Sequence, residues 1–319
     1  MILTVTLNAA IDRTVAVPNL RLGRRHRAVE SRTVAGGKGV NVARALKLLG
    51  RPVIATGLAG GPTGARILEL LTEESILNDF TTIGGESRTN LAIVDPTSGE
   101  QTEVNERGPE VAPDEVEQFV EKLLYLAQGA SLCVLAGTLP PGVDEAVYAR
   151  LVSELRRMGV QTLLDTEGEP MRLGLRAEPA VVAPNVEEAE GAVGHEFNDA
   201  DDVAMGLASL LEMGAREAII TRPAGCVAIL AENGSRHRYE VEIDPLDPVS
   251  TVGSGDCFLA GYAAARYEGG SPRECLAFGV ACGADSTQHF GAGTVNARDA
   301  ERLVSRVDVR EVDVPARVA

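Results

Sequence analysis

Apolar residues along this chain occur as short continuous runs that alternate with longer segments of helical periodicity. The short runs predict strands at 2–7, 53–57, 132–136, 162–165, 180–183, 218–221 and 227–230. The helical spacing predicts helices at 38–49, 64–74, 113–127, 144–158, 199–213, 256–267, 271–288 and 296–305. Because buried strands that alternate with helices form sheets covered on both faces, we expect an α/β fold with a mainly parallel central sheet. Such a sheet binds ligands at the carboxyl ends of its strands.

Two segments, 10–33 and 88–107, break this alternation. Both contain short stretches in which apolar and polar residues alternate, and the turn Asp95–Gly99 separates two strands of the second segment. These strands belong either at the edge of the main sheet or in a small β structure of their own. The tail 306–319 carries no strong pattern, and we expect it to be weakly structured.

Composition narrows the classes of partner. The 319 residues include no Trp and only 3% aromatics, which disfavours a base-stacking platform. A formal net charge of −16 disfavours nucleic acid and anionic membranes as partners. An anionic substrate would therefore need a local basic cluster. The candidates are the run Arg24–Arg27, which is otherwise a solvated loop, and Lys38 and Arg44 after it.

The five cysteines form no CxxC pair and have no metal-ligand spacing. The chain begins with a strand-like run, Ile2–Leu7, in place of a charged segment followed by an apolar one. No apolar run approaches the ~20 residues that span a bilayer. We therefore expect reduced thiols and a cytoplasmic protein without a membrane partner.

The segment Ser250–Gly261, with the sequence STVGSGDCFLAG, is the most informative part of the chain. A glycine turn here leads directly into an apolar helix, whose first N–H groups are unpaired and bind anions. Gly253 and Gly255 allow the backbone to approach an anion closely. Asp256 lies at the junction, where it either caps the helix or takes a proton from a hydroxyl group beside that anion.

A second glycine turn leads into a helix at Ala35–Leu46, with the sequence AGGKGVNVARAL. Lys38 and Asn41 supply a cation and an amide that suit a polyol or a phosphate. The run lacks the GxxxxGK[ST] pattern, which disfavours P-loop chemistry. Two sites of this kind in one chain favour function over simple capping.

These two segments resemble the two signatures of the PfkB/ribokinase family of carbohydrate kinases. The resemblance runs through the whole chain in the family's order, and its other motifs are Thr4–Asp12, Ser87–Asn90, Ala136–Gly142 and Pro184–Glu188. It implies a ribokinase-like three-layer α/β/α sandwich with a small β-strand lid. The implied core comprises 1–9, 34–87 and 108–319, and the implied lid over the sugar site comprises 10–33 and 88–107.

The resemblance also implies a role for each matching residue. Asp256 becomes the general base, with the low pKa expected of a carboxylate at a helix start, and Gly253, Ser254 and Gly255 bind the transferring phosphoryl group. The sugar phosphate is held by Asp12, Gly37, Lys38, Asn41, Thr138, Arg88 and Arg27, the last two on its phosphate. The nucleotide is held by Asn185, Thr221, Gly225, Gly253 and Gly255. Asn185 and Glu188, three residues apart on one helix face, are the candidate ligands of Mg²⁺, although Asn185 is equally a helix cap.

The chain departs from the family pattern around the nucleotide. Ala183 stands where the family often has Lys, Pro223 and Cys226 occupy usual glycine positions, and Gly225 comes one residue early. The implied reaction is ATP- and Mg²⁺-dependent phosphorylation of a ketohexose phosphate, with fructose 1-phosphate as the leading substrate. Tagatose 6-phosphate and fructose 6-phosphate are the nearest alternatives, and a non-catalytic sugar-phosphate sensor is a more remote one. Lid strands can pair between subunits, which makes a homodimer the expected assembly.

Overall fold

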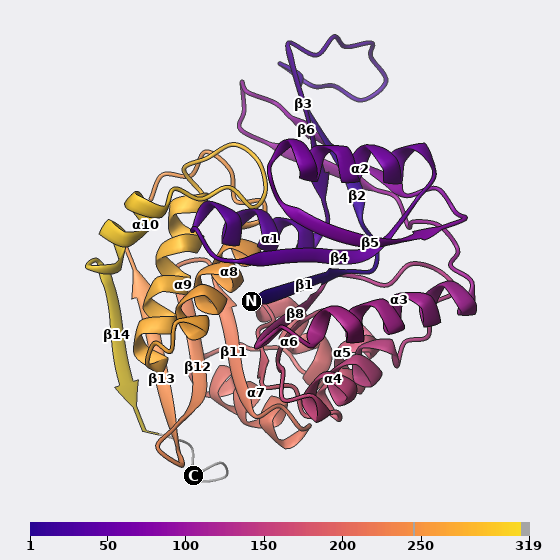
Figure 1. The fold of residues 1–319 in the computed structure, drawn as a ribbon. Helices are drawn as coiled ribbons and strands as arrows, with labels where there is room; N and C mark the ends of the chain where they lie inside the picture. The colour runs from indigo at the N-terminus through magenta and orange to yellow at the C-terminus, as the bar shows by residue number, and fades with distance from the viewer. Residues whose placement is uncertain (245, 314–319) are drawn as a thin grey trace.

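A computed structural model describes residues 1–244 and 246–313 (Figure 1). Its main sheet has ten strands in the order β14-β13-β12-β11-β10-β9-β8-β1-β4-β5. In chain order, they are β1 (Ile2–Thr6), β4 (Val53–Gly60), β5 (Leu77–Ile83), β8 (Leu132–Ala136), β9 (Gln161–Asp165), β10 (Val181–Val182), β11 (Glu217–Arg222), β12 (Gly225–Glu232), β13 (Ser235–Ile243) and β14 (Val307–Val312). The strands from β11 to β5 pair in parallel, and β12, β13 and β14 extend the sheet as an antiparallel edge.

Helices cover both faces of this sheet (Figure 1). They are α1 (Lys38–Leu48), α2 (Gly61–Glu73), α3 (Pro113–Ala127), α4 (Val147–Arg157), α5 (Gly168–Leu175), α6 (Val186–Val193), α7 (Ala200–Glu212), α8 (Ser254–Tyr267), α9 (Pro272–Ser286) and α10 (Ala297–Val304). One face packs against α1, α2, α8, α9 and α10 through a large aliphatic cluster. The other face packs against α3 and α4 in a second cluster and α5, α6 and α7 in a third. The expected three-layer α/β/α sandwich with a mainly parallel central sheet is therefore confirmed.

The two segments that break the alternation form a separate small sheet. Its order is β3-β2-β6-β7, built from β2 (Ala10–Ala16), β3 (Glu30–Gly36), β6 (Arg88–Val94) and β7 (Gln101–Asn105). The central pair, β2 and β6, is parallel, and the outer pairs are antiparallel. In Figure 1, this sheet projects from one end of the molecule, above α2. It contributes strands to neither edge of the main sheet.

We expected residues 306–319 to be weakly structured, and this prediction was wrong for residues 307–312. Residues 307–312 form β14, which pairs with β13 along the edge of the main sheet. Both strands alternate polar and apolar residues, with one side packed on α9 and the other open, so neither shows a continuous apolar run. Residues 314–319 lie outside the described part of the chain. No helix among the described residues is both long enough and apolar enough to cross a bilayer.

Candidate active site

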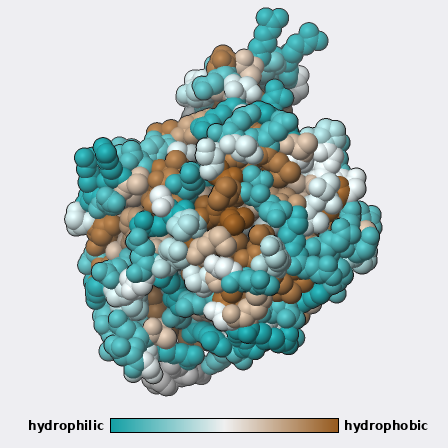
Figure 2. Space-filling model, viewed as in Figure 1, coloured by the Kyte–Doolittle hydropathy of each residue, from teal (hydrophilic) through white to brown (hydrophobic). Residues whose placement is uncertain are grey.

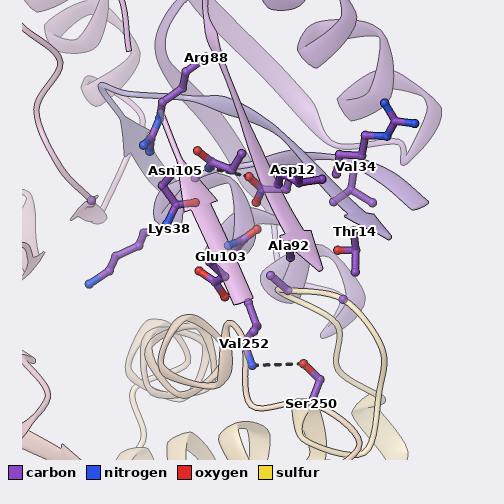
Figure 3. Close-up of a pocket in the computed structure, with 18 of the residues that line it drawn as sticks. Asp12, Thr14, Val34, Lys38, Arg88, Ala92, Glu103, Asn105, Ser250 and Val252 are labelled. Carbon is purple, nitrogen blue, oxygen red and sulfur yellow. Dashed lines mark hydrogen bonds between the residues drawn. The ribbon is translucent and has the colours of Figure 1, made fainter. Parts of the chain in front are cut away.

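A cavity of about 510 Å³ lies between the small sheet and the carboxyl ends of β1 and β8. Figure 3 shows Asp12, Thr14, Arg88 and Ala92 on strands of the small sheet, and Ser250 and Val252 on the loop that faces them. The cavity is also lined by Gly37, Lys38, Asn41, Thr138 and the turn 290–292. Residues from distant parts of the sequence thus meet at the end of the sheet where an open α/β fold binds its ligand.

The glycine turn before α8 adopts a conformation that requires glycine. Gly253 has φ = 76°, and a Cβ there would lie 2.8 Å from the Cβ of Ala292. At Gly255, a Cβ would meet no atom within 4 Å, which leaves the start of α8 open. The Gly255 N–H is therefore accessible to an anion, whereas the Ser254 N–H donates to the Thr251 carbonyl at 3.3 Å.

The carboxylate of Asp256 is buried in the first turn of α8, with 7% of the residue exposed. Its Oδ2 accepts a hydrogen bond of 2.8 Å from Nδ2 of Asn41 on α1. Among the described residues, none donates to Oδ1. Asp256 itself does not line the cavity, but Asn41 does. The carboxylate is therefore held at the cavity wall by α1.

The pKa expected for Asp256 from its place at a helix start was wrong in direction. Burial raises the pKa of Asp256 from 3.8 to about 7, against the lowering effect of the Lys38 charge and the Asn41 hydrogen bond, while Asp165 and Asp12 raise it further. Desolvation outweighs the helix dipole because the carboxylate is enclosed between α1 and α8. A carboxylate that titrates near neutral pH is well matched to proton transfer.

Lys38 lies between two carboxylates, one at the end of β9 and one on α6. Its Nζ is 3.0 Å from Oδ1 of Asp165, the last residue of β9, and 2.7 Å from Oε1 of Glu188 on α6. Burial lowers the pKa of Lys38, but the two carboxylates outweigh burial and raise it. Burial also acts on Asp165 and raises the pKa of its carboxyl group, whereas the Lys38 charge lowers it. Asp165 was absent from the predicted site, although an acidic residue at the end of a predicted strand was a usable signal.

The pair Asn185 and Glu188 forms a capping box at the start of α6. The Asn185 side chain accepts from the Glu188 N–H, and Glu188 Oε2 accepts from the Asn185 N–H, both at 2.9 Å. In this structure, Asn185 therefore takes the alternative role of a helix cap. Among the described residues, no group of three or more His, Cys, Asp or Glu side chains is arranged to hold a metal ion.

Asp12 on β2 is fixed by its neighbours in the small sheet. Asn90 on β6 donates from Nδ2 to its Oδ1 at 2.8 Å. A Cβ at Gly36 would lie only 2.0 Å from Oδ2 of Asp12, so glycine at this position makes room for the carboxylate. Burial raises the pKa of Asp12, against the Asn90 hydrogen bond and the Arg88 charge. Asp12 therefore presents a constrained carboxylate to the cavity.

Arg88 at the start of β6 lines the cavity and is held by two carbonyl groups. Its Nε donates to the Asn8 carbonyl at 3.2 Å, and its Nη1 donates to that of Glu106 at 2.9 Å. Thr138 also lines the cavity, with its hydroxyl 3.4 Å from Nδ2 of Asn8. These bonds anchor the Arg88 guanidinium beside Asp12.

The structure does not bring Arg27 to this cavity within one chain. Arg27 is exposed in the long loop between β2 and β3. Two arginines that were not predicted, Arg13 on β2 and Arg32 on β3, line the cavity instead. For Arg32, alternation along β3 was the available signal, because Arg32 pairs with Thr14 and so lies on the same face of the small sheet.

The predicted nucleotide loop forms a tight hairpin between β11 and β12. Arg222 pairs with Gly225, so only Pro223 and Ala224 form the turn. Gly225 has φ = 147°, and a Cβ there would lie 1.9 Å from the Val241 carbonyl oxygen. Glycine is therefore needed for the close approach of β13. Thr221 lies beside Asn185 through an isolated parallel bridge, which joins the hairpin to the start of α6.

The site combines an open helix start, a buried carboxylate that titrates near neutrality, and a cavity with arginines beneath a small sheet. This combination defines an α/β phosphoryl-transfer enzyme. Comparison with known proteins agrees: residues 3–299 match the family described as pfkB family carbohydrate kinase. The chain therefore belongs to the pfkB family of carbohydrate kinases and is a sugar kinase.

Solved structures of similar proteins cover nearly the whole chain. Phosphofructokinase-2 from Escherichia coli is 28% identical, with a TM-score of 0.88 over 95% of this chain and 98% of that one. A possible 1-phosphofructokinase from Thermotoga maritima is 26% identical, with a TM-score of 0.88 over 98% of this chain and 100% of that one. Ribokinase from Arabidopsis thaliana, complexed with ribose and ATP, is 19% identical with a TM-score of 0.75 over 95% and 98%, which shows the fold alone. The expected hexose-phosphate branch is consistent with the first two.

Proposed function

We propose that this protein transfers the terminal phosphoryl group of ATP to a hydroxyl group of a ketohexose phosphate, with fructose 1-phosphate as the leading substrate and fructose 1,6-bisphosphate as the product. The observation that carries this proposal is the Asp256 carboxylate at the start of α8. It is buried, has a pKa near 7 and is held against the cavity by Asn41. The Asp256 side chain does not cap α8, because it accepts from Asn41 on α1 and makes no capping hydrogen bond to the first N–H groups of its own helix.

Asp256 accepts the proton of the attacking hydroxyl through its unpaired Oδ1. The hydroxyl oxygen forms a bond to the terminal phosphorus of ATP, the bond from that phosphorus to the bridging oxygen breaks, and ADP leaves. A loose transition state needs little deprotonation, so the main work of Asp256 is to position the hydroxyl group. The N–H groups of residues 253–255 stabilise the charge on the transferring group.

The remaining cavity residues hold the sugar phosphate. Asp12 accepts hydrogen bonds from sugar hydroxyls, and the neighbouring Gly37 and Thr138 complete that wall. Arg88 binds the phosphate already on the sugar, because a guanidinium group makes two parallel hydrogen bonds to phosphate oxygens. Its anchoring by two carbonyl groups supports this role. Lys38 neutralises charge where the sugar and nucleotide meet.

ATP and Mg²⁺ fit the groups around the end of β9 and the start of α6. The open N-terminus of α8 suits a nucleotide phosphate, and Thr221 and Gly225 border the same end of the sheet. Glu188 and Asn185 remain the proposed magnesium ligands, and Asp165 adds a carboxylate. Mg²⁺ commonly keeps several waters and binds through one or two carboxylates and substrate phosphates, so a complete protein cage is not required. When bound, it neutralises phosphate charge.

The small sheet acts in this proposal as a lid, and a homodimer forms through it. Leu22 and Val29, in the loop between β2 and β3, are 98% and 70% exposed, which supports coverage by a second copy. Figure 2 shows that the tip of the projection is otherwise hydrophilic. Arg27 lies between these two residues and reaches a sugar phosphate only across such a dimer. All five cysteines are free and buried, which supports a reducing, cytoplasmic location.

The test is ADP release with ATP and Mg²⁺ against fructose 1-phosphate, fructose 6-phosphate, tagatose 6-phosphate and free fructose. Turnover of one phosphorylated ketose identifies the substrate and supports the proposal. Turnover of fructose 6-phosphate or tagatose 6-phosphate alone replaces fructose 1-phosphate by that alternative. Calorimetric binding of a sugar phosphate without ADP release under any condition would contradict the kinase proposal and favour a sensor.

A further inference from the structure

A buried arginine behind the cavity has no role in the proposed reaction so far. Arg44 on α1 has a side chain that is only 8% exposed. Burying a charge of this kind is costly unless it is paired and fully hydrogen-bonded. The position of Arg44, one turn beyond Asn41, therefore calls for an explanation from its contacts.

Every N–H of the Arg44 guanidinium has a partner. Nε and Nη2 form a two-point ion pair with Glu74, which follows the last residue of α2, and the Nη2 contact to Oε1 is 3.0 Å. The other Nη2 hydrogen bond goes to the Ala35 carbonyl at 2.6 Å. Nη1 donates to Oδ1 of Asn41 at 3.0 Å and to the Ala292 carbonyl at 3.3 Å. These bonds use all five donors of the group.

The bond to Asn41 decides which way that amide points. A guanidinium group can only donate, so the atom of Asn41 that faces Arg44 must be the oxygen. The nitrogen of the same amide must then face Asp256, to which it donates at 2.8 Å. If the amide were reversed, its nitrogen would face the N–H donors of Arg44, and its oxygen would face the carboxylate of Asp256. Arg44 thus ensures that Asn41 presents its side-chain N–H group to Asp256.

The bond to Ala292 connects Arg44 to the second part of the site. Ala292 lies directly against Gly253, where an added Cβ would be 2.8 Å from the Ala292 side chain. The next residue, Gly293, packs so closely on the Asn41 backbone that a Cβ there would be 2.6 Å from its carbonyl oxygen. The turn at 292–293 is therefore clamped between α1 and the glycine turn that precedes α8.

We propose that Arg44, anchored by Glu74, is a positioning residue that orients the Asn41 amide toward Asp256 and holds the 292–293 turn against Gly253. The proposal rests on the proposed function for its consequence in catalysis, but the orientation itself is a property of the unliganded protein. Arg44 acts through its neighbours and does not contact the reacting groups.

A titration of the Asn41 side-chain amide by NMR tests this directly. Its signal is assigned by its loss in Asn41→Ala and should follow the ionisation of Asp256, with a midpoint near 7 in the wild type. The charges of Lys38, Asp165 and Asp12 also act on Asp256, but they remain in every Arg44 variant. A shift in a variant that keeps a positive charge at position 44 therefore reports the orientation of Asn41.

The informative variant is Arg44→Lys, because it keeps the positive charge and loses the planar fork. We expect the midpoint to rise by about one pH unit, because a carboxylate loses an oriented donor. In kcat/KM, a rise of one unit from pH 7 corresponds to about a ninefold loss at pH 6 and almost none at pH 9. Arg44→Met should shift the midpoint at least as far. Arg51→Met is the matched control, because Arg51 forms an ion pair with Glu268 away from the site.

An unshifted midpoint in Arg44→Lys, with a shift only in Arg44→Met, would mean that Arg44 acts through its charge alone and would overturn the proposal. A loss of activity by the same factor at every pH would reduce Arg44 to a structural residue. If the wild type turns over none of the sugar phosphates, the proposed function fails, and the NMR titration still tests the orientation of Asn41.

Discussion

Replacing Asp256 by asparagine should make the protein more stable at neutral pH while it destroys activity. The pKa of the Asp256 carboxyl group is about 7 in the folded chain, above its ordinary value of 3.8. The folded chain therefore binds this proton more tightly than the unfolded chain does. Between these two values, the folded state holds the extra proton, so stability falls as the pH rises from about 4 to about 7. Above pH 7, the wild type carries a buried charge that the neutral amide of the Asp256→Asn variant does not carry.

The size of this effect follows from the two pKa values. At 1.36 kcal/mol per pH unit, the interval from 3.8 to about 7 corresponds to about 4 kcal/mol of lost stability. With an unfolding entropy of ~2.1 cal/mol/K per residue over 319 residues, that difference is a rise in Tm of about 6 °C. The Asp256→Asn variant should show this gain at pH 8 and almost none at pH 4.

The assay is thermal unfolding of the unliganded protein at a series of pH values. The informative quantity is the difference in Tm between variant and wild type, because titrations elsewhere cancel. Asp201→Asn, at an exposed position in the first turn of α7, is the matched control and should show no comparable rise with pH. A Tm difference that stays constant from pH 5 to pH 8, or a less stable variant at pH 8, would show that ionised Asp256 does not destabilise the folded chain.

Three further changes test other parts of the site. Arg88→Gln should raise KM for the phosphorylated ketose about 10- to 100-fold in steady-state kinetics, through the loss of a charge-assisted pair, with kcat nearly unchanged; an equal effect on free fructose would argue against a phosphate contact. Gly253→Ala should cost about 1–3 kcal/mol in denaturant unfolding because φ is 76°, whereas Gly255→Ala should cost little, and equal losses would contradict this. Lys38→Met should move the acidic limb of kcat/KM to higher pH, because the Lys38 charge lowers the pKa of Asp256, and an unmoved limb would disagree.

Much of the fold could be predicted because most of its strands are buried on both faces. Continuous apolar runs identified β1, β4, β8, β9 and β11, and helical spacing identified most of the helices that cover them but missed the short helices α5 and α6. The pattern failed at the edges. β13 and β14 alternate polar and apolar residues, and β5 is half exposed, so none of these three shows the run that marks a central strand.

The site was predictable as a set of residue types but not as a set of interactions. The motifs named Asp12, Lys38, Asn41 and Asp256, and the structure gathers them around one cavity. The pKa of Asp256 depends on how tightly α1 packs on α8, which local sequence does not contain. Arg44 was noted only as part of a basic stretch, because its burial arises from contacts with α2 and the turn at 292–293.

The most direct test of the central claim is ADP release with ATP, Mg²⁺ and the preferred ketohexose phosphate, measured at pH 8 for wild type and Asp256→Asn. A positioned general base contributes about 100- to 10,000-fold, so we predict a loss of kcat in that range in a variant that unfolds at a higher temperature than wild type. A variant that keeps kcat within about tenfold of wild type would contradict the assignment of Asp256 as the catalytic base.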